Sequence, residues 1–247
     1  MRLLGQPRVS PVLDGSSTLE LGSVKLTGEQ IASRYKPIVR QKSAWQDRPL
    51  RIQYEVFEEA SEYTIRYHIV WLDETHPIRP LNLIYRPFRI LYYGSTVDIE
   101  RIQVSVDRNT GRISTVVFET EPSKGSSAFP SHARAELSRR GQGYALLIDN
   151  GQAVEASPTF KGDRVEILVS NWNHEFSISF SPLGTTAFDL PLGFLGDDEY
   201  VALRYATRMQ ANSDRFHKAR TGILLMCWFI LSPLVILLTR SPFSFDR

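Results

Sequence analysis

The sequence predicts a mainly β protein: an antiparallel β-sandwich-like soluble domain, a C-terminal juxtamembrane helix and a single transmembrane helix. Many short segments alternate apolar and polar residues, which is the two-residue period of a strand with one buried face. Turn-forming residues separate these segments at close spacing, as in sandwiches and barrels. One run, residues 221–239, has no charged residue and is long enough to cross a bilayer.

These observations divide the chain into parts. We expect an N-terminal extension (1–26), a β-rich soluble domain (27–196), a basic juxtamembrane helix (197–220), a transmembrane helix (221–239) and a short tail (240–247). Within the soluble domain, EPSKGSSAFPS is rich in Ser, Gly and Pro and is typical of a loop. A subdomain boundary is therefore placed near 121–131.

Composition narrows the classes of function. The 29 basic and 27 acidic residues give a net charge of +2, which offers no overall electrostatic attraction to nucleic acid. The single cysteine excludes an intrachain disulfide and a cysteine-rich metal site. Neither a glycine-rich phosphate loop nor a G-x-S-x-G motif occurs. We expect no nucleic-acid partner and no bound cofactor, and an enzyme is the less favoured interpretation.

Helices are expected to be few. Thr27 suits the N-cap of a short helix, Gln30 completes a capping box, and Pro37 ends it. A second helical candidate, PLNLIYRPFRILYY, contains Pro87, which argues against one continuous helix.

The strands are expected to pair as hairpins. The segments at 50–58 and 62–73 alternate well and are joined by the turn EEASE. DRNTGR connects the strand at 102–107 to ISTVVFE in a second hairpin. In GYALLIDNGQAVEA, Asn150 and Gly151 form a favoured two-residue turn. Further strands are RVEILVS and EFSISFS.

Two carboxylates at the start of one predicted strand do not fit its alternation of buried apolar and exposed polar residues. Ile102 and Val104 belong to its buried face, and counting back by twos places Glu100 and Asp98 on that same face. A bulge near Glu100–Arg101 would switch the phase, and this is the preferred explanation. Otherwise both carboxylates enter the interior and bind a cation, share a proton or meet an arginine. The nearby arginines make an ion-pair network more expected than a metal; they are Arg79, Arg86, Arg89 and Arg101.

The stretch from Gly94 to Glu100 resembles the signature heptapeptide of the necrosis-inducing (NPP1-like) β-sandwich family, Gly-His-Arg-His-Asp-Trp-Glu. Gly, Asp and Glu match in register, and RYKPIV at 34–39 is similar to the motif that opens such domains. Ser95 and Val97 stand where the family has histidines. The resemblance implies a β-sandwich, and in the family this motif helps to hold a divalent cation. It does not imply a toxin activity.

A cation site is the alternative to a structural cluster. Asp98, Glu100 and His76 would hold a divalent cation in a membrane-tethered hydrolase. A polar loop after a strand is the simpler interpretation of His76, because no second histidine lies at ligand spacing.

The apolar run predicts a single-pass, tail-anchored membrane protein with a cytoplasmic domain, because basic residues gather before the run. A periplasmic or luminal domain is the minority interpretation. Two groups of residues are expected to act at the membrane. Those that contact lipid headgroups are Arg208, Arg215, Lys218 and Arg220. Those that pack against other membrane helices are Gly222, Cys227 and Ser232.

The function expected from these features is that of an accessory, assembly or scaffold subunit of a membrane complex. Its partners would be membrane lipid and one or more integral-membrane proteins. Two alternatives remain open: the cation-dependent hydrolase, and a sandwich that binds lipid or carbohydrate through exposed aromatic residues.

Overall fold

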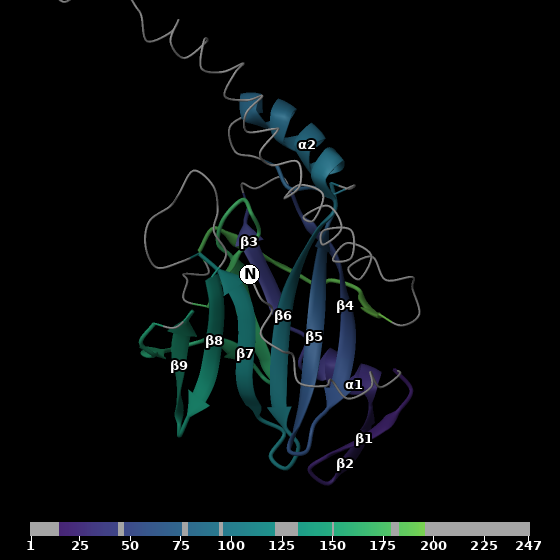
Figure 1. The fold of residues 1–247 in the computed structure, drawn as a ribbon. Helices are drawn as coiled ribbons and strands as arrows, with labels where there is room; N and C mark the ends of the chain where they lie inside the picture. The colour runs from purple at the N-terminus through teal and green to yellow at the C-terminus, as the bar shows by residue number, and fades with distance from the viewer. Residues whose placement is uncertain are drawn as a thin grey trace, which may run out of the picture.

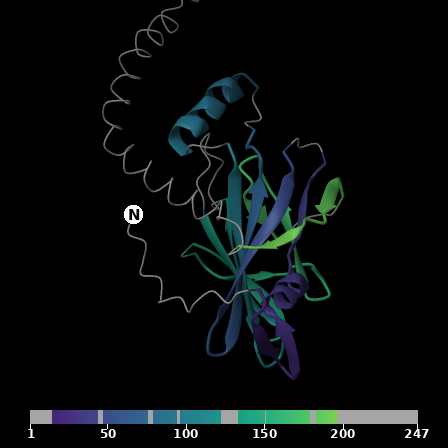
Figure 2. The same ribbon diagram turned by 90° about the vertical axis from the view of Figure 1, so that its right-hand side faces the viewer.

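The computed structural model describes residues 15–43, 47–75, 79–93, 96–121, 133–149, 151–178 and 183–195. This part of the chain is mainly β, as predicted. Its strands form a two-stranded, an eight-stranded and a five-stranded sheet. The five-stranded sheet lies behind the eight-stranded one in Figure 1, and Figure 2 shows the same layers after a quarter turn.

The eight-stranded sheet has the order β10-β9-β8-β7-β6-β5-β4-β15. Its neighbouring strands are antiparallel except at one edge, where β15 runs parallel to β4. The strands are β4 (Pro49–Glu58), β5 (Glu62–Trp71), β6 (Asp98–Asp107), β7 (Ile113–Thr120), β8 (Ala133–Arg140), β9 (Gly143–Ile148), β10 (Val154–Ala156) and β15 (Leu192–Phe194).

The five-stranded sheet has the order β11-β12-β3-β14, with β13 also paired to β12. Here β12 runs parallel to β3, so the predicted antiparallel arrangement holds for most pairs but not for all. The strands are β3 (Ile38–Lys42), β11 (Phe160–Lys161), β12 (Arg164–Val169), β13 (Phe176–Ser177) and β14 (Thr185–Phe188).

A small hairpin of β1 (Thr18–Leu21) and β2 (Val24–Thr27) occupies the end of the segment assigned to the N-terminal extension (1–26) and crosses its boundary by one residue. Leu19 and Leu21 are buried and join the main core.

One hydrophobic core fills the space between the two large sheets. The larger sheet contributes side chains such as Ile65 and Val104, and the smaller sheet contributes Val39 and Ile167. Burial of each such side chain stabilises the fold by about 1.5–3 kcal/mol. Strands β7 and β8, on either side of the predicted subdomain boundary, pair directly in one sheet.

The two hairpins β4–β5 and β6–β7 are confirmed. Strands β9 and β10 pair antiparallel, so the hairpin predicted around Asn150-Gly151 is confirmed as well, but β9 ends at Ile148 and β10 begins at Val154. The connection is therefore longer than two residues.

Helix α1 (Gly28–Arg34) begins with the predicted capping box. The Thr27 side chain accepts a hydrogen bond from the Gln30 amide, and the Gln30 side chain accepts one from the Thr27 amide.

Helix α2 (Arg79–Tyr93) continues through Pro87, so the expected interruption is wrong. Proline removes the hydrogen bond to the carbonyl of Leu83. Both residues are exposed, so water can replace that bond. Figure 1 shows α2 beyond one end of the sandwich, at the end where β6 begins.

No helix in the ranges described above is long and apolar enough to cross a membrane. The predicted juxtamembrane and transmembrane segments, 197–220 and 221–239, lie outside the described residues.

Candidate functional site: a buried ion cluster beneath α2

Asp98 and Glu100 both face the interior. The pairing of β6 with β5 is unbroken from Asp107 to Asp98, so the bulge preferred from the sequence is wrong. Their exposed fractions are 6% and 7%. Buried carboxylates are costly unless other groups compensate them. The surrounding side chains provide that compensation for Asp98.

Arg89 of α2 is the main compensating group. Its Nη2 atom lies 3.0 Å from Oδ1 of Asp98, and its Nη1 atom lies 2.5 Å from Oε2 of Glu74. The Arg89 side chain is 1% exposed. The predicted arginine partner is therefore confirmed, and one guanidinium joins two carboxylates from different segments.

Glu74 follows β5 and is also held by α2. The hydroxyl of Tyr85 donates a hydrogen bond of 2.6 Å to Oε1 of Glu74. At the rim, Arg86 forms an exposed ion pair of 3.1 Å with Asp73. The Tyr85 ring also meets Trp172 edge-on, with centroids 5.5 Å apart. These contacts fix α2 to the end of the sandwich.

His174 completes the cluster, and sequence reasoning missed it. Its Nδ1 atom lies 2.7 Å from Oδ2 of Asp98 and donates a hydrogen bond to that carboxylate. Its ring stacks on Trp71 with centroids 4.4 Å apart. The backbone φ of His174 is 58°, in the left-handed region that few non-glycine residues adopt.

The turn that carries His174 is organised by Asn171. The Asn171 amide nitrogen donates to Oε2 of Glu175 at 2.6 Å and to Oε1 of Glu121 at 2.7 Å. Its side-chain oxygen accepts from the backbone N–H groups of Asn173 and Glu175. The only sequence signal was a polar run, NWNHE, between two strands.

The cluster shifts the pKa of its carboxyl groups in opposite directions. Burial and the negative charge of Asp98 together raise the pKa of Glu74 to about 7, against the lowering effect of Arg89. Burial also raises the pKa of Asp98, but the hydrogen bond from His174 and the charge of Arg89 outweigh it, so the net shift is downward. Asp98 is therefore the ionised partner of Arg89.

Glu100 lies one position further along the buried face of β6. Burial and the negative charge of Asp98 raise its pKa well above the usual range. The raised pKa favours the neutral form of this carboxyl group, which avoids a second buried charge beside Asp98.

The other residues predicted for a site lie outside the described ranges. They are His76, the headgroup-contacting residues Arg208, Arg215, Lys218 and Arg220, and the helix-packing residues Gly222, Cys227 and Ser232. Among the residues that the structure describes, no group of three or more His, Cys, Asp or Glu is arranged to hold a metal ion. A cation at Asp98, Glu100 and His76 stays a prediction.

No family model and no curated protein matches the chain. Two solved structures are similar to it: NLPPya, an NPP1-like necrosis-inducing protein, in complex with glucosamine and in complex with mannosamine. Each match has a TM-score of 0.38 and 13% identity and covers 76% of this chain, with 78% and 79% of the respective NLPPya chains. These values support a weak NPP1-like resemblance and carry no argument about activity.

Proposed function

We propose that this protein is a membrane-anchored accessory subunit whose β-domain binds an integral-membrane partner through α2. The observation that carries the proposal is the buried Arg89, which uses the carboxylates of Glu74 and Asp98 as a structural anchor. The two ion pairs of Arg89 hold α2 in place against the sheet.

The low solvent exposure of the ion cluster favours a structural role for it over a catalytic one. The side chain of His174 is 1% exposed and that of Asp98 is 8% exposed. A general base must come within hydrogen-bond reach of a proton on its substrate. Trp71, stacked on the His174 ring, covers one face of the imidazole. The proposal therefore assigns His174 and Asp98 to the positioning of α2 on the sheet.

The outer side of α2 provides the docking surface. Leu83 is 79% exposed and Leu81 is 46% exposed, and Leu72 just after β5 is 63% exposed. We call Leu83 and Arg86 the α2 surface, because side chains three positions apart lie on the same side of a helix. We take this side of α2 as the contact for a partner.

The chemistry of the α2 surface favours one kind of partner. Helix α2 contains no acidic residue, and Arg86 is its arginine on this surface. A complementary surface carries apolar side chains bordered by carboxylates. The apolar run at 221–239 is expected to hold the domain beside a bilayer, where an integral-membrane protein is at high effective concentration.

A charge placed on the α2 surface tests the proposal. The Leu83→Glu variant and the control Val154→Glu are expressed as full chains and extracted with mild detergent. Val154 is 56% exposed on β10, at the far edge of the sheet. We expect a stoichiometric membrane protein to co-purify with wild type and with Val154→Glu, and to be lost from Leu83→Glu.

Two results would overturn the proposal. In one, Leu83→Glu retains the partner as well as the control does. In the other, no polypeptide co-purifies, and Leu83→Glu instead abolishes binding to anionic vesicles, which would make the α2 surface a lipid contact.

A further inference from the structure

A second surface lies at the opposite end of the sandwich from α2. A cavity of about 480 Å³ opens between the β6–β7 turn and the β8–β9 turn. Strand β6 runs from Asp98 beneath α2 to Asp107 at this cavity, so the two sites are separated by the length of the strand (Figure 1). The cavity belongs neither to the ion cluster nor to the α2 surface.

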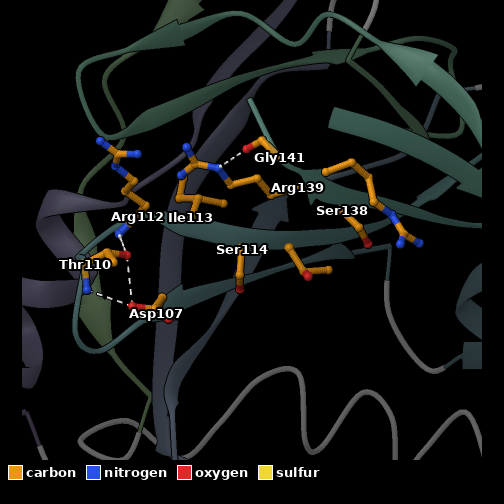
Figure 3. A pocket seen from close by; sticks show the side chains of 10 residues that line it. Asp107, Thr110, Arg112, Ile113, Ser114, Ser138, Arg139 and Gly141 are labelled. Atoms are coloured by element: carbon orange, nitrogen blue, oxygen red, sulfur yellow. Dashed lines mark hydrogen bonds between the residues drawn. The ribbon is translucent and has the colours of Figure 1, made fainter. Parts of the chain in front are cut away.

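Basic side chains dominate the cavity. Arg112, Arg139 and Arg140 line it, together with hydroxyl groups of residues such as Ser114 and Ser138 (Figure 3). Among the described residues, no carboxylate forms an ion pair with any of the three arginines. Arg139 donates from Nε to the carbonyl of Gly141, which leaves its two terminal amino groups available.

One acidic residue, Asp107, lines the cavity, and the turn already uses it. Its Oδ1 atom accepts hydrogen bonds from the backbone N–H groups of Asn109 and Thr110 and from the Thr110 hydroxyl. The Asp107 carboxylate therefore already has hydrogen-bond donors in the turn. With three arginines and one aspartate, the lining of the cavity has a net positive charge.

We propose that this cavity binds a small polar ligand that carries phosphate or sulfate ester groups. Guanidinium groups recognise such oxyanions through paired N–H donors. The Ser114 and Ser138 hydroxyls already donate to the Ser105 carbonyl and to Glu136, so the arginines are the donors on which the proposal rests. The volume suits a molecule of sugar-phosphate size. Ile113 is the one large apolar lining residue, which disfavours an apolar ligand.

Calorimetric titration of the full chain in neutral detergent tests the proposal. The probes are inositol hexakisphosphate and sucrose octasulfate, with uncharged myo-inositol as the ligand control. The variants are Arg112→Ala/Arg140→Ala and the control Arg101→Ala, which removes an exposed arginine from β6. Binding of one anion but not the other distinguishes phosphate from sulfate recognition, and binding of both indicates a site for either oxyanion.

We expect the double variant to weaken anion binding at least tenfold, and Arg101→Ala to leave it unchanged. Arg112→Lys/Arg140→Lys should restore part of the affinity, because the charge returns without the paired donors. Absence of binding by wild type would overturn the proposal. Equal losses in the double variant and in Arg101→Ala would also overturn it, because they would indicate attraction to overall charge.

Discussion

Arg89 on α2 and Asp98 on β6 meet inside the protein, with Nη2 and Oδ1 3.0 Å apart and side chains 1% and 8% exposed. Both charges are removed from water, so the loss of either leaves the other with one partner fewer. Arg89 would then keep Glu74, and Asp98 would keep His174. The same contact also fixes the helix to the sheet. Stability and the position of α2 are therefore coupled through one guanidinium.

Replacing Arg89 with methionine should strongly destabilise the protein. The Arg89→Met variant leaves Asp98 and Glu74 without their shared cation, and we expect the free energy of unfolding to fall by about 3–5 kcal/mol. Arg86→Met is the matched control, because its ion pair is exposed at the rim, with the arginine 57% exposed. It should cost no more than about 1 kcal/mol. Urea unfolding of the full chain in detergent measures both, and equal costs would contradict a structural role for Arg89.

The two carboxylates of β6 should respond differently to amide substitution. Asp98→Asn removes the charge that Arg89 and His174 hold, and we expect a loss of about 3 kcal/mol or more. Glu100→Gln replaces a buried carboxyl of raised pKa with a neutral amide of similar shape, and at pH 7 it should leave the free energy of unfolding unchanged or raise it. Reversed effects would mean that Glu100 carries the buried charge.

The cluster should make stability fall as pH rises. Glu74 has a folded-state pKa of about 7 against an ordinary value of 4.5. The folded state therefore binds more protons between these values, and the free energy of unfolding decreases across the window. Each group with such a raised pKa contributes a slope of at most about 1.4 kcal/mol per pH unit.

Unfolding measurements from pH 5 to pH 8 check this dependence. Glu74→Gln should flatten the profile in that range, whereas the control Glu29→Gln, an exposed residue of α1, should not. The lowered pKa of Asp98 acts with the opposite sign and only at lower pH, because its stabilisation is lost as Asp98 becomes protonated. A wild-type profile that is level from pH 5 to pH 8 would contradict the raised pKa of Glu74.

The capping box at the start of α1 gives a separate prediction. Thr27→Ala removes the acceptor for the Gln30 amide, so the free energy of unfolding should fall by about 1 kcal/mol. Thr27→Ser keeps the acceptor and should retain most of the stability. Thermal unfolding followed by circular dichroism compares the two variants.

Local patterns were sufficient to predict much of the fold. The alternation at 50–58 and 62–73 reports a buried face directly, and the Thr27 capping box depends only on neighbours in sequence. The continuity of α2 through Pro87 was not predictable in this way. The cost of a proline depends on whether the lost hydrogen bond faces water, and that is set by how the helix sits on the sheet.

For the candidate site too, local sequence patterns predicted part of the arrangement, and contacts between distant residues determined the rest. Counting by twos placed Asp98 and Glu100 on the buried face, but the bulge was preferred because phase shifts are common at the starts of strands. His174 lies 76 positions from Asp98, and no periodicity or spacing connects the two. Arg89 was one of four candidate arginines, and only the packing of α2 on the sheet selects it.

The central claim is that α2, held by Arg89, binds a membrane protein through its outer side. A photoreactive phenylalanine analogue at position 83, in place of Leu83, tests it most directly when irradiated in the native membrane, with position 154 as the control. The account predicts one discrete adduct with a polypeptide from position 83 and none from position 154. Adducts with lipid alone, or the same products from both positions, would contradict it.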